Sequence, residues 1–173
     1  MTVRTVSRPE LLDGDGSDTT FRGMVYHLLA VGARMQEVRD RLAREMGVTG
    51  PQYAILMAIF HLQEEFSGPG VRAVARRLHV SGPFVTAQSR FLVNEGLVEK
   101  KPNPLDGRGV WLCLTEEGSR RIAHTAELSQ KANDAFFGSL DSVHFLVLSD
   151  IATRLEKSSD RAVRALNEPT KPV

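Results

Sequence analysis

Apolar residues recur at helical spacing along most of the chain, after a polar beginning. Residues 1–18 are polar and contain Pro9 and the sequence DGDGSD, which predicts a flexible N-terminal arm. From about residue 20 to Gly47, apolar positions repeat every three or four residues with charged residues between them, which predicts a long amphipathic helix ending before Gly47. The next stretch, TGPQYAILMAIFHLQEEF, has Pro51 in a first-turn position and is apolar nearly all round. It predicts a helix buried in the middle of a domain.

Two short helical segments follow the SGPG break. In VRAVARRLHV, apolar residues occupy one face and Arg72 and Arg76 another. Ser81 is a suitable N-cap, with Pro83 tolerated in the first turn, for a helix that runs to about Asn94. Gly96 provides the stop after this helix. The pattern is typical of a helix-turn-helix unit.

Beyond Gly96 the pattern changes to that of strands. LVEKK and VWLCLT, separated by the turn-rich PNPLDGRG, predict a β-hairpin in which one face of the second strand is core. Thr115 caps a further helix that runs toward Phe137, and DSVHFLVLSDIATRLEKSSDRAVRAL predicts a last helix after Gly138.

Two helices followed by a hairpin form a winged helix. The second helix of such a unit fits the major groove of DNA, and the hairpin tip reaches the adjacent minor groove, whose negative potential attracts arginine. Arg108 lies between Gly107 and Gly109 at the predicted tip, where Asp106 can brace its guanidinium. Arg108 is therefore the strongest single candidate for DNA contact.

The helix that starts after Ser81 has two sides. A helical wheel places Val85, Ser89, Leu92 and Val93 on the core side and Pro83, Ala87, Arg90 and Asn94 opposite, with Thr86, Phe84 and Phe91 at the borders. Arginine, asparagine and threonine at such positions contact phosphates and base edges. The predicted DNA-binding residues are Arg72, Arg76, Ser81, Pro83, Thr86, Arg90, Asn94, Asp106 and Arg108, with Arg77, Lys100 and Lys101 as further phosphate contacts.

The predicted fold class is mostly α with a small β-hairpin wing: a winged helix-turn-helix core flanked by long dimerisation helices. The core covers residues 48–114, the helical dimerisation region covers 19–47 and 115–166, and 167–173 form a C-terminal tail. The formal net charge of +1 provides no strong global field, so any preference for nucleic acid must come from local clustering. With one cysteine, no signal-peptide pattern and no apolar run long enough to cross a bilayer, the expected location is the cytoplasm.

The stretch from Val71 to Gly118 resembles the winged-helix core of the MarR family of bacterial transcriptional regulators. The motifs are A-x-x-L-x-V-S, V-T in the second helix, L-x-x-x-G-L-V at its end, D-x-R in the wing and L-T-x-x-G after it. The resemblance implies a homodimer, joined by its N- and C-terminal helices, that binds a pseudo-palindromic operator. It also implies DNA contact by Ser81, Pro83, Thr86 and Arg90 in the helix and by Asp106 and Arg108 in the wing.

Many members of that family are repressors released by small aromatic or phenolic ligands, and some by thioesters, oxidants or metals. In this family the effector often lies between the first two helices and the winged-helix core. An aromatic wall with an arginine and a histidine suits an aromatic carboxylate or its thioester. The predicted ligand-binding residues are His27, Arg34, Tyr53, Phe60 and His61. The alternative is that the aromatic residues are core and Arg34 is a surface or interface ion.

Other functions have weaker support in the sequence. Within DNA-binding regulators, the alternative is an oxidant sensor that acts through Cys113. The sequence has no second cysteine to resolve an oxidised form of Cys113, which argues against it. The five histidines show no close metal spacing, and no metal or cofactor is predicted. No recognisable catalytic motif is present, so an enzyme is not predicted. A winged helix that contacts protein and not DNA remains a second alternative.

Overall fold

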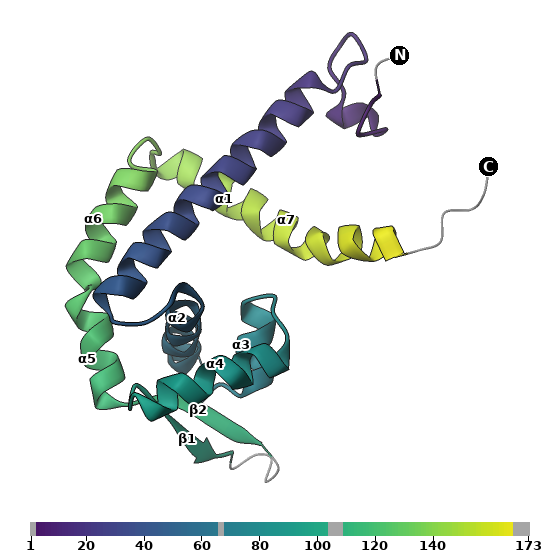
Figure 1. Cartoon of the computed structure of the whole chain (residues 1–173). Helices are drawn as coiled ribbons and strands as arrows, with labels where there is room; N and C mark the ends of the chain where they lie inside the picture. The colour runs from purple at the N-terminus through teal and green to yellow at the C-terminus, as the bar shows by residue number, and fades with distance from the viewer. Residues whose placement is uncertain (1–2, 66–67, 104–108, 168–173) are drawn as a thin grey trace. The chain divides into compact units, whose positions relative to one another are not determined.

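The computed structural model describes residues 3–65, 68–103 and 109–167 (Figure 1). The chain divides into two compact units, Met1–Ser129 and Gln130–Val173. The elements are η1 (Pro9–Leu11), α1 (Thr19–Glu45), α2 (Gly50–Glu65), α3 (Val71–Arg77), α4 (Gly82–Asn94), β1 (Val98–Pro102), β2 (Val110–Leu114), α5 (Glu116–His124), α6 (Ala126–Phe137) and α7 (Ser142–Asn167). The predicted fold class, mostly α with one hairpin, is confirmed.

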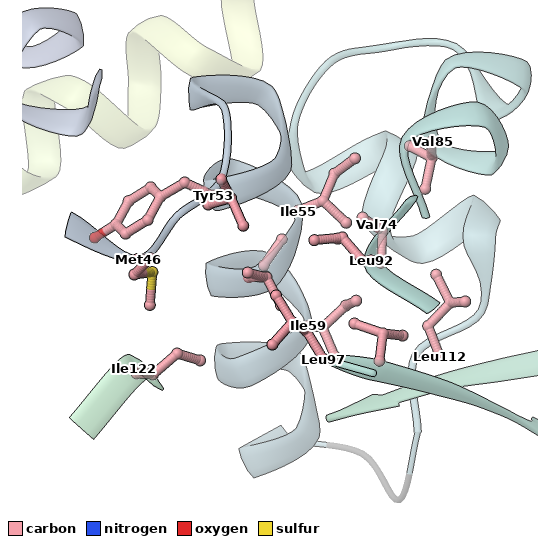
Figure 2. Close-up of a cluster of buried hydrophobic side chains, with 14 of the residues drawn as sticks. Met46, Tyr53, Ile55, Ile59, Val74, Val85, Leu92, Leu97, Leu112 and Ile122 are labelled. Atoms are coloured by element: carbon pink, nitrogen blue, oxygen red, sulfur yellow. The ribbon is translucent and has the colours of Figure 1, made fainter. Parts of the chain in front are cut away.

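Helix α2 is the centre of the first unit, as its nearly all-round apolar sequence predicts. It contacts α1, α3, α4 and β2, and Ile55 and Ile59 are fully buried. Figure 2 shows these side chains meeting Val74 from α3 and Leu92 from α4. Burial of a large aliphatic side chain contributes about 1.5–3 kcal/mol, so this core holds the winged helix together.

Helix α1 joins that core only near its C-terminal end, through Leu42, Ala43 and Met46. The helix stops as predicted because Gly47 has φ +73°, a left-handed conformation that suits glycine. The Val48 N–H then donates to the Ala43 carbonyl at 2.9 Å. Most large apolar side chains on the preceding part of α1 are exposed.

The described part of the predicted arm, residues 3–18, has a defined hydrogen-bonded path. The Asp18 side chain is buried, and its Oδ2 accepts hydrogen bonds from the Thr5 N–H at 2.6 Å and the Thr5 hydroxyl at 2.7 Å. Arg22 Nη1 lies 3.0 Å from the other oxygen of Asp18. The Thr5 hydrogen bonds and the Arg22 charge lower the pKa of Asp18. Asp18 therefore ties the arm to the start of α1.

The turn between α3 and α4 brings the two helices of the helix-turn-helix together. His79 has φ 52°, and the Val80 N–H donates to the Ala75 carbonyl at 3.0 Å. The predicted N-cap of α4 is confirmed, since the Phe84 N–H donates to Ser81 Oγ at 3.3 Å. The predicted stop is confirmed at Gly96, which has φ +67°.

Strands β1 and β2 pair antiparallel, with Val98 opposite Leu114 and Lys100 opposite Leu112. A further pairing, which was not predicted, joins Gly70 to Trp111 in an antiparallel bridge on the other side of β2. Gly68 lies against the Trp111 ring, where a Cβ would clash. The linker between α2 and α3 is therefore part of the wing's base.

The motif L-T-x-x-G has a direct structural role. Thr115 Oγ1 donates to the Gly96 carbonyl at 2.6 Å and accepts from the Gly118 N–H at 3.0 Å. A Cβ at Gly118 would collide with the Leu97 carbonyl oxygen. Thr115 and Gly118 thus fix the start of α5 against the end of α4.

The prediction of a single helix from Thr115 toward Phe137 is wrong in one respect. The helix is interrupted at Thr125, between α5 and α6. Thr125 is buried, and its hydroxyl donates to the Ile122 carbonyl at 3.0 Å. A threonine hydroxyl that bonds the preceding turn competes with the helical backbone ladder, which accounts for the interruption.

Candidate nucleic-acid interface

Helix α4 presents the two sides that the sequence predicts. Val85, Ser89 and Leu92 are buried, and Ser89 satisfies its hydroxyl by donating to the Val85 carbonyl at 2.6 Å. The opposite side is exposed and carries Pro83, Ala87, Arg90 and Asn94, while Thr86 at the border is half-buried. Four of the predicted DNA-binding residues therefore lie on or beside the free face of one helix.

Ser81, the fifth predicted residue of this helix, is exposed and serves as its N-cap. Its Oγ accepts one backbone N–H, and its hydroxyl hydrogen has no partner within the part of the chain that the structure describes. The N-terminus of a helix also carries the positive end of the helix dipole. This end of α4 is therefore suited to an anionic neighbour.

The arginines of α3 and α4 are exposed, and they have no side-chain partner among the described residues. Arg72, Arg76 and Arg77 lie on α3 and Arg90 on α4. Within residues 3–65, 68–103 and 109–167, none of these four forms a hydrogen bond or ion pair with another side chain. Residues 71–103 hold six basic and two acidic side chains, a local excess that the net charge of +1 conceals.

Strand β1 adds two lysines beside these arginines in the sequence. Lys100 is exposed, and Lys101 Nζ lies 2.8 Å from Glu99 Oε1. This hydrogen bond and the Glu99 charge raise the pKa of Lys101, so the lysine stays positive at neutral pH. Only Lys100 is available to an external anion without breaking an ion pair.

Asp106 and Arg108, the predicted wing-tip residues, lie outside the described residues. The strands on either side are in place, and the Asn103 N–H donates to the Gly109 carbonyl at 3.1 Å. The minor-groove role of Arg108 stays a prediction.

The predicted ligand-binding residues do not form one cluster. His27 and Arg34 are exposed on α1, and Arg34 Nη1 lies 2.7 Å from Glu37 Oε2. On α2, the Phe60 and His61 rings meet edge to face with centroids 5.3 Å apart. Tyr53 is buried, and burial raises its pKa, opposed by the charge of Arg39.

A small pocket lies where α1, the start of α2 and the α3–α4 turn meet. Its volume is about 180 Å³, and its walls are mostly apolar. Arg39 is half-buried there; it donates to Gln36 Oε1 at 3.1 Å and pairs with no acid among the described residues. The lining residues are Gln36, Arg39, Gly50, Pro51, Ala54, Leu78, Val80 and Phe84. None of them was predicted to bind a ligand; the half-buried arginine was not distinguishable in sequence from other charged residues of α1.

A second, basic pocket of about 390 Å³ lies between the end of α1 and α5. Arg121 donates to Glu117 Oε1 at 2.8 Å and to the Met46 carbonyl at 3.1 Å, and so caps the C-terminus of α1. Arg120 also binds Glu117, and the two arginines lower the pKa of that carboxyl. Arg120 and Arg121 therefore have a structural role in this pocket.

Cys113 is only 4% exposed, and burial raises the pKa of its thiol. A buried thiol with a raised pKa is a poor nucleophile, which weighs against oxidant sensing.

Within the described residues, no group of three or more metal-ligating side chains comes together. Among those residues, too, no single helix is long and apolar enough to cross a membrane; α6 and α7 pass that test only as a bent pair.

No family model and no curated protein matches the chain. Solved structures do. A MarR transcriptional regulator from Methanosarcina mazei Go1 is 16% identical, with 80% of this chain and 98% of that chain covered and a TM-score of 0.65. CouR from Rhodococcus jostii RHA1 bound to p-coumaroyl-CoA is 20% identical over 77% and 91%, with a TM-score of 0.69. The S. aureus MepR–DNA complex is 17% identical over 78% and 94%, with a TM-score of 0.67. The expected resemblance is confirmed at the level of structure: this chain has the winged-helix fold of the MarR transcriptional regulators.

Proposed function

We propose that this protein is a ligand-responsive, DNA-binding transcriptional regulator of the cytoplasm. In this proposal a homodimer binds a pseudo-palindromic operator as a repressor, and a small aromatic or phenolic acid, or its thioester, releases it. The fold supports the general class, and the other steps rest on the surfaces described above.

The unpaired arginines of α3 and α4 are the observation that carries the proposal. Within the described residues, the arginines of α1, α5 and α7 other than Arg44 have acidic or polar partners, as Arg34 has Glu37. Four guanidinium groups that have no side-chain partner among the described residues of the helix-turn-helix are the complement of a phosphate backbone, whose neutralisation releases counterions. Thr86 and Asn94 add groups able to hydrogen-bond phosphates or base edges on the same helix.

The exposed apolar side chains of α1 and α7 support a homodimer. On α7 the large exposed apolar residues are Val143, Phe145, Leu146, Val147, Leu148, Ile151, Leu155, Val163 and Leu166. Such a surface marks an interaction site, and a second copy of the chain supplies a matching apolar surface. A two-fold dimer presents two α4 helices to two half-sites of a palindrome.

The 180 Å³ pocket supports an aromatic acid as effector. Its apolar walls suit one ring, and Arg39, which has no acidic partner among the described residues, suits a carboxylate. The structural neighbours include CouR with p-coumaroyl-CoA and a regulator, BpsR of Bordetella bronchiseptica, whose DNA binding is regulated by 6-hydroxynicotinic acid. The predicted set of His27, Arg34, Tyr53, Phe60 and His61 remains a second candidate location on α1 and α2.

Release needs only a difference in affinity. A ligand that binds a DNA-incompetent dimer about 100-fold more tightly shifts the equilibrium by about 2.7 kcal/mol. The pocket includes Val80 and Phe84, which flank the start of α4, so an occupant there contacts the proposed DNA-binding helix directly.

Fluorescence anisotropy on duplex from the protein's own upstream region tests the proposal. We expect binding that weakens steeply with salt, is reduced in Arg90→Ala and is reversed by benzoate or 4-hydroxycinnamate used as probes. Absence of duplex binding at low salt would reject DNA binding and favour the alternative of a protein-contact module. Binding that responds to peroxide but not to these acids, with the response lost in Cys113→Ser, would favour the oxidant sensor.

A further inference from the structure

The free face of α4 changes in chemistry along the helix. Its first two turns expose Pro83, Phe84 and Ala87, whose side chains have no hydrogen-bond donor or acceptor. Its last two turns expose Arg90, whose side chain has hydrogen-bond donors, and Asn94, whose side chain has a donor and an acceptor. Apolar side chains therefore dominate the N-terminal half of a surface that the proposed function brings to DNA.

Phe84 is the large residue of this apolar half. It is 38% exposed although it stands in the first turn of α4, two residues from Gly82. One part of its surface lines the pocket shared with Pro51 and Val80, and its backbone N–H is held by Ser81 Oγ. Helical side chains lean toward the N-terminus of their helix, so this ring is carried toward the leading end of α4.

Base edges in the major groove differ in how they meet an apolar ring. Three of the four bases present only hydrogen-bonding groups there, and thymine adds a C5-methyl group. The residues near the N-terminus of a recognition helix are the ones that contact base edges. A phenylalanine at that end strengthens binding when it covers a methyl group. It weakens binding when it covers a polar base edge, because it cannot replace the hydrogen bonds that the edge makes with water.

We propose that Phe84 is a specificity-determining residue that selects a thymine by contact with its C5-methyl group in each operator half-site. Ala87, one turn further on the free face, leaves room for the base beside it. Arg90 and Asn94 then supply the hydrogen-bonding part of the readout. This inference rests on the proposed DNA-binding function and adds the identity of one base pair per half-site.

The experiment replaces thymine by uracil, which removes the methyl group and leaves every hydrogen-bonding atom unchanged. Duplexes bound by the wild-type protein are first selected from a random library. The selected duplex is then synthesised with 2′-deoxyuridine in place of each thymine in turn, and affinities are measured by anisotropy.

We expect one thymine per half-site whose replacement lowers wild-type affinity about fourfold, and about fifteenfold when both half-sites are changed, since a buried methyl-sized group contributes that factor. Phe84→Ser should bind the thymine and uracil duplexes equally. The control is Phe91→Ser, which removes an aromatic ring that is 44% exposed on the C-terminal half of the same helix and should keep the thymine preference.

Equal affinity of the wild-type protein for thymine and uracil at every position would overturn the inference, and this comparison needs no variant to fold. So would a thymine preference that persists in Phe84→Ser. If the wild-type protein selects no duplex, the inference fails together with the proposed function. If the protein selects a duplex but binds it equally well without the thymine methyl groups, only the role of Phe84 is rejected, and the proposed function stands.

Discussion

The winged-helix core and helix α7 differ in which of their described side chains they leave exposed without a partner: arginines in the core, and apolar residues in α7. The core buries its apolar residues around α2, and the arginines of α3 and α4 have no side-chain partner in the part of the chain that the structure describes. Helix α7 leaves its apolar residues exposed and provides its arginines with partners, as in the 2.8 Å contact between Arg154 Nε and Asp150 Oδ2. The core thus lacks an anionic partner and α7 lacks an apolar one. DNA and a second copy of the chain meet these two requirements.

The arginines of α1 and α5 follow the pattern of α7. Each except Arg44 has a hydrogen-bond or ion-pair partner within the described residues, such as Arg41 with Glu45 and Arg121 with Glu117. Exposed ion pairs contribute little stability, about 0–1 kcal/mol, so their main consequence is that these helices offer little free positive charge. The contrast therefore separates the surface that we propose faces DNA from the helices whose arginines have partners.

The largest expected effect comes from substituting the exposed apolar residues of α7. Phe145→Ser with Leu146→Ser removes two exposed large apolar side chains that a dimer would bury. Each contributes about 1.5–3 kcal/mol when buried, so the dimer dissociation constant should rise about a hundredfold or more. Sedimentation equilibrium measures this, with Lys157→Ser as the control on the same helix. A monomeric wild-type protein, or equal dissociation constants in variant and control, would contradict the dimer.

A substitution in the buried core should act on folding. Ile59 is 0% exposed, and Ile59→Ala should lower the free energy of unfolding by about 2–5 kcal/mol because it leaves a cavity beside α4 and the hairpin. Ile59→Val, the conservative control, should cost about 0.5–1.5 kcal/mol. Urea denaturation compares them. A loss in Ile59→Ala no greater than that of the valine variant would show that α2 is not the centre of the core.

The junction between the hairpin and α5 should respond more weakly. Thr115→Ala removes the N-cap of α5 and the hydrogen bond to Gly96, and should cost about 0.5–2 kcal/mol of unfolding free energy. Thr115→Ser keeps both contacts and should stay close to the wild type in the same denaturation experiment. Equal losses in the two variants would mean that the methyl group of Thr115, and not its hydroxyl, matters.

The smallest expected effect is the acid sensitivity of the N-terminal arm. Asp18 has a pKa below its ordinary value, mainly because of the hydrogen bonds from Thr5. A carboxyl whose pKa is depressed in the folded state contributes stability above its unfolded pKa and loses it as the pH falls through the folded pKa. The protection of the amides of residues 3–18 against hydrogen exchange, relative to the intrinsic exchange rate at each pH, should therefore fall below about pH 4. In Asp18→Asn the exchange should be fast at neutral pH and lack this acid-dependent step; an unchanged profile would contradict the role of Asp18.

Features set by local sequence were predicted correctly. Ser81 caps α4, Gly47 and Gly96 take left-handed conformations at helix ends, and the wheel of α4 separates Leu92 from Arg90 as observed. These depend on residues within one or two turns, where capping chemistry and helical periodicity decide the outcome.

Features that depend on distant parts of the chain were not predicted. The bridge from Gly70 to Trp111 joins residues that are 41 positions apart, which local periodicity does not reveal. The pocket is lined by both Arg39 and Phe84, whereas the predicted ligand-binding residues lie elsewhere on α1 and α2 and stay a prediction. Periodicity identifies which face of a helix is apolar, but not which neighbouring helix leaves space against it.

The contrast between paired and unpaired arginines is tested most directly by the salt dependence of DNA binding. Arg72→Ala with Arg76→Ala removes two unpaired charges per chain, and Arg41→Ala with Arg120→Ala removes two paired ones. If each of the first pair contacts a phosphate in both halves of a dimer, the slope of log K against log salt should become shallower by about 3.6. The second variant should keep the wild-type slope. Equal changes in the two variants would contradict the account, because the unpaired arginines would then have no special place at the DNA.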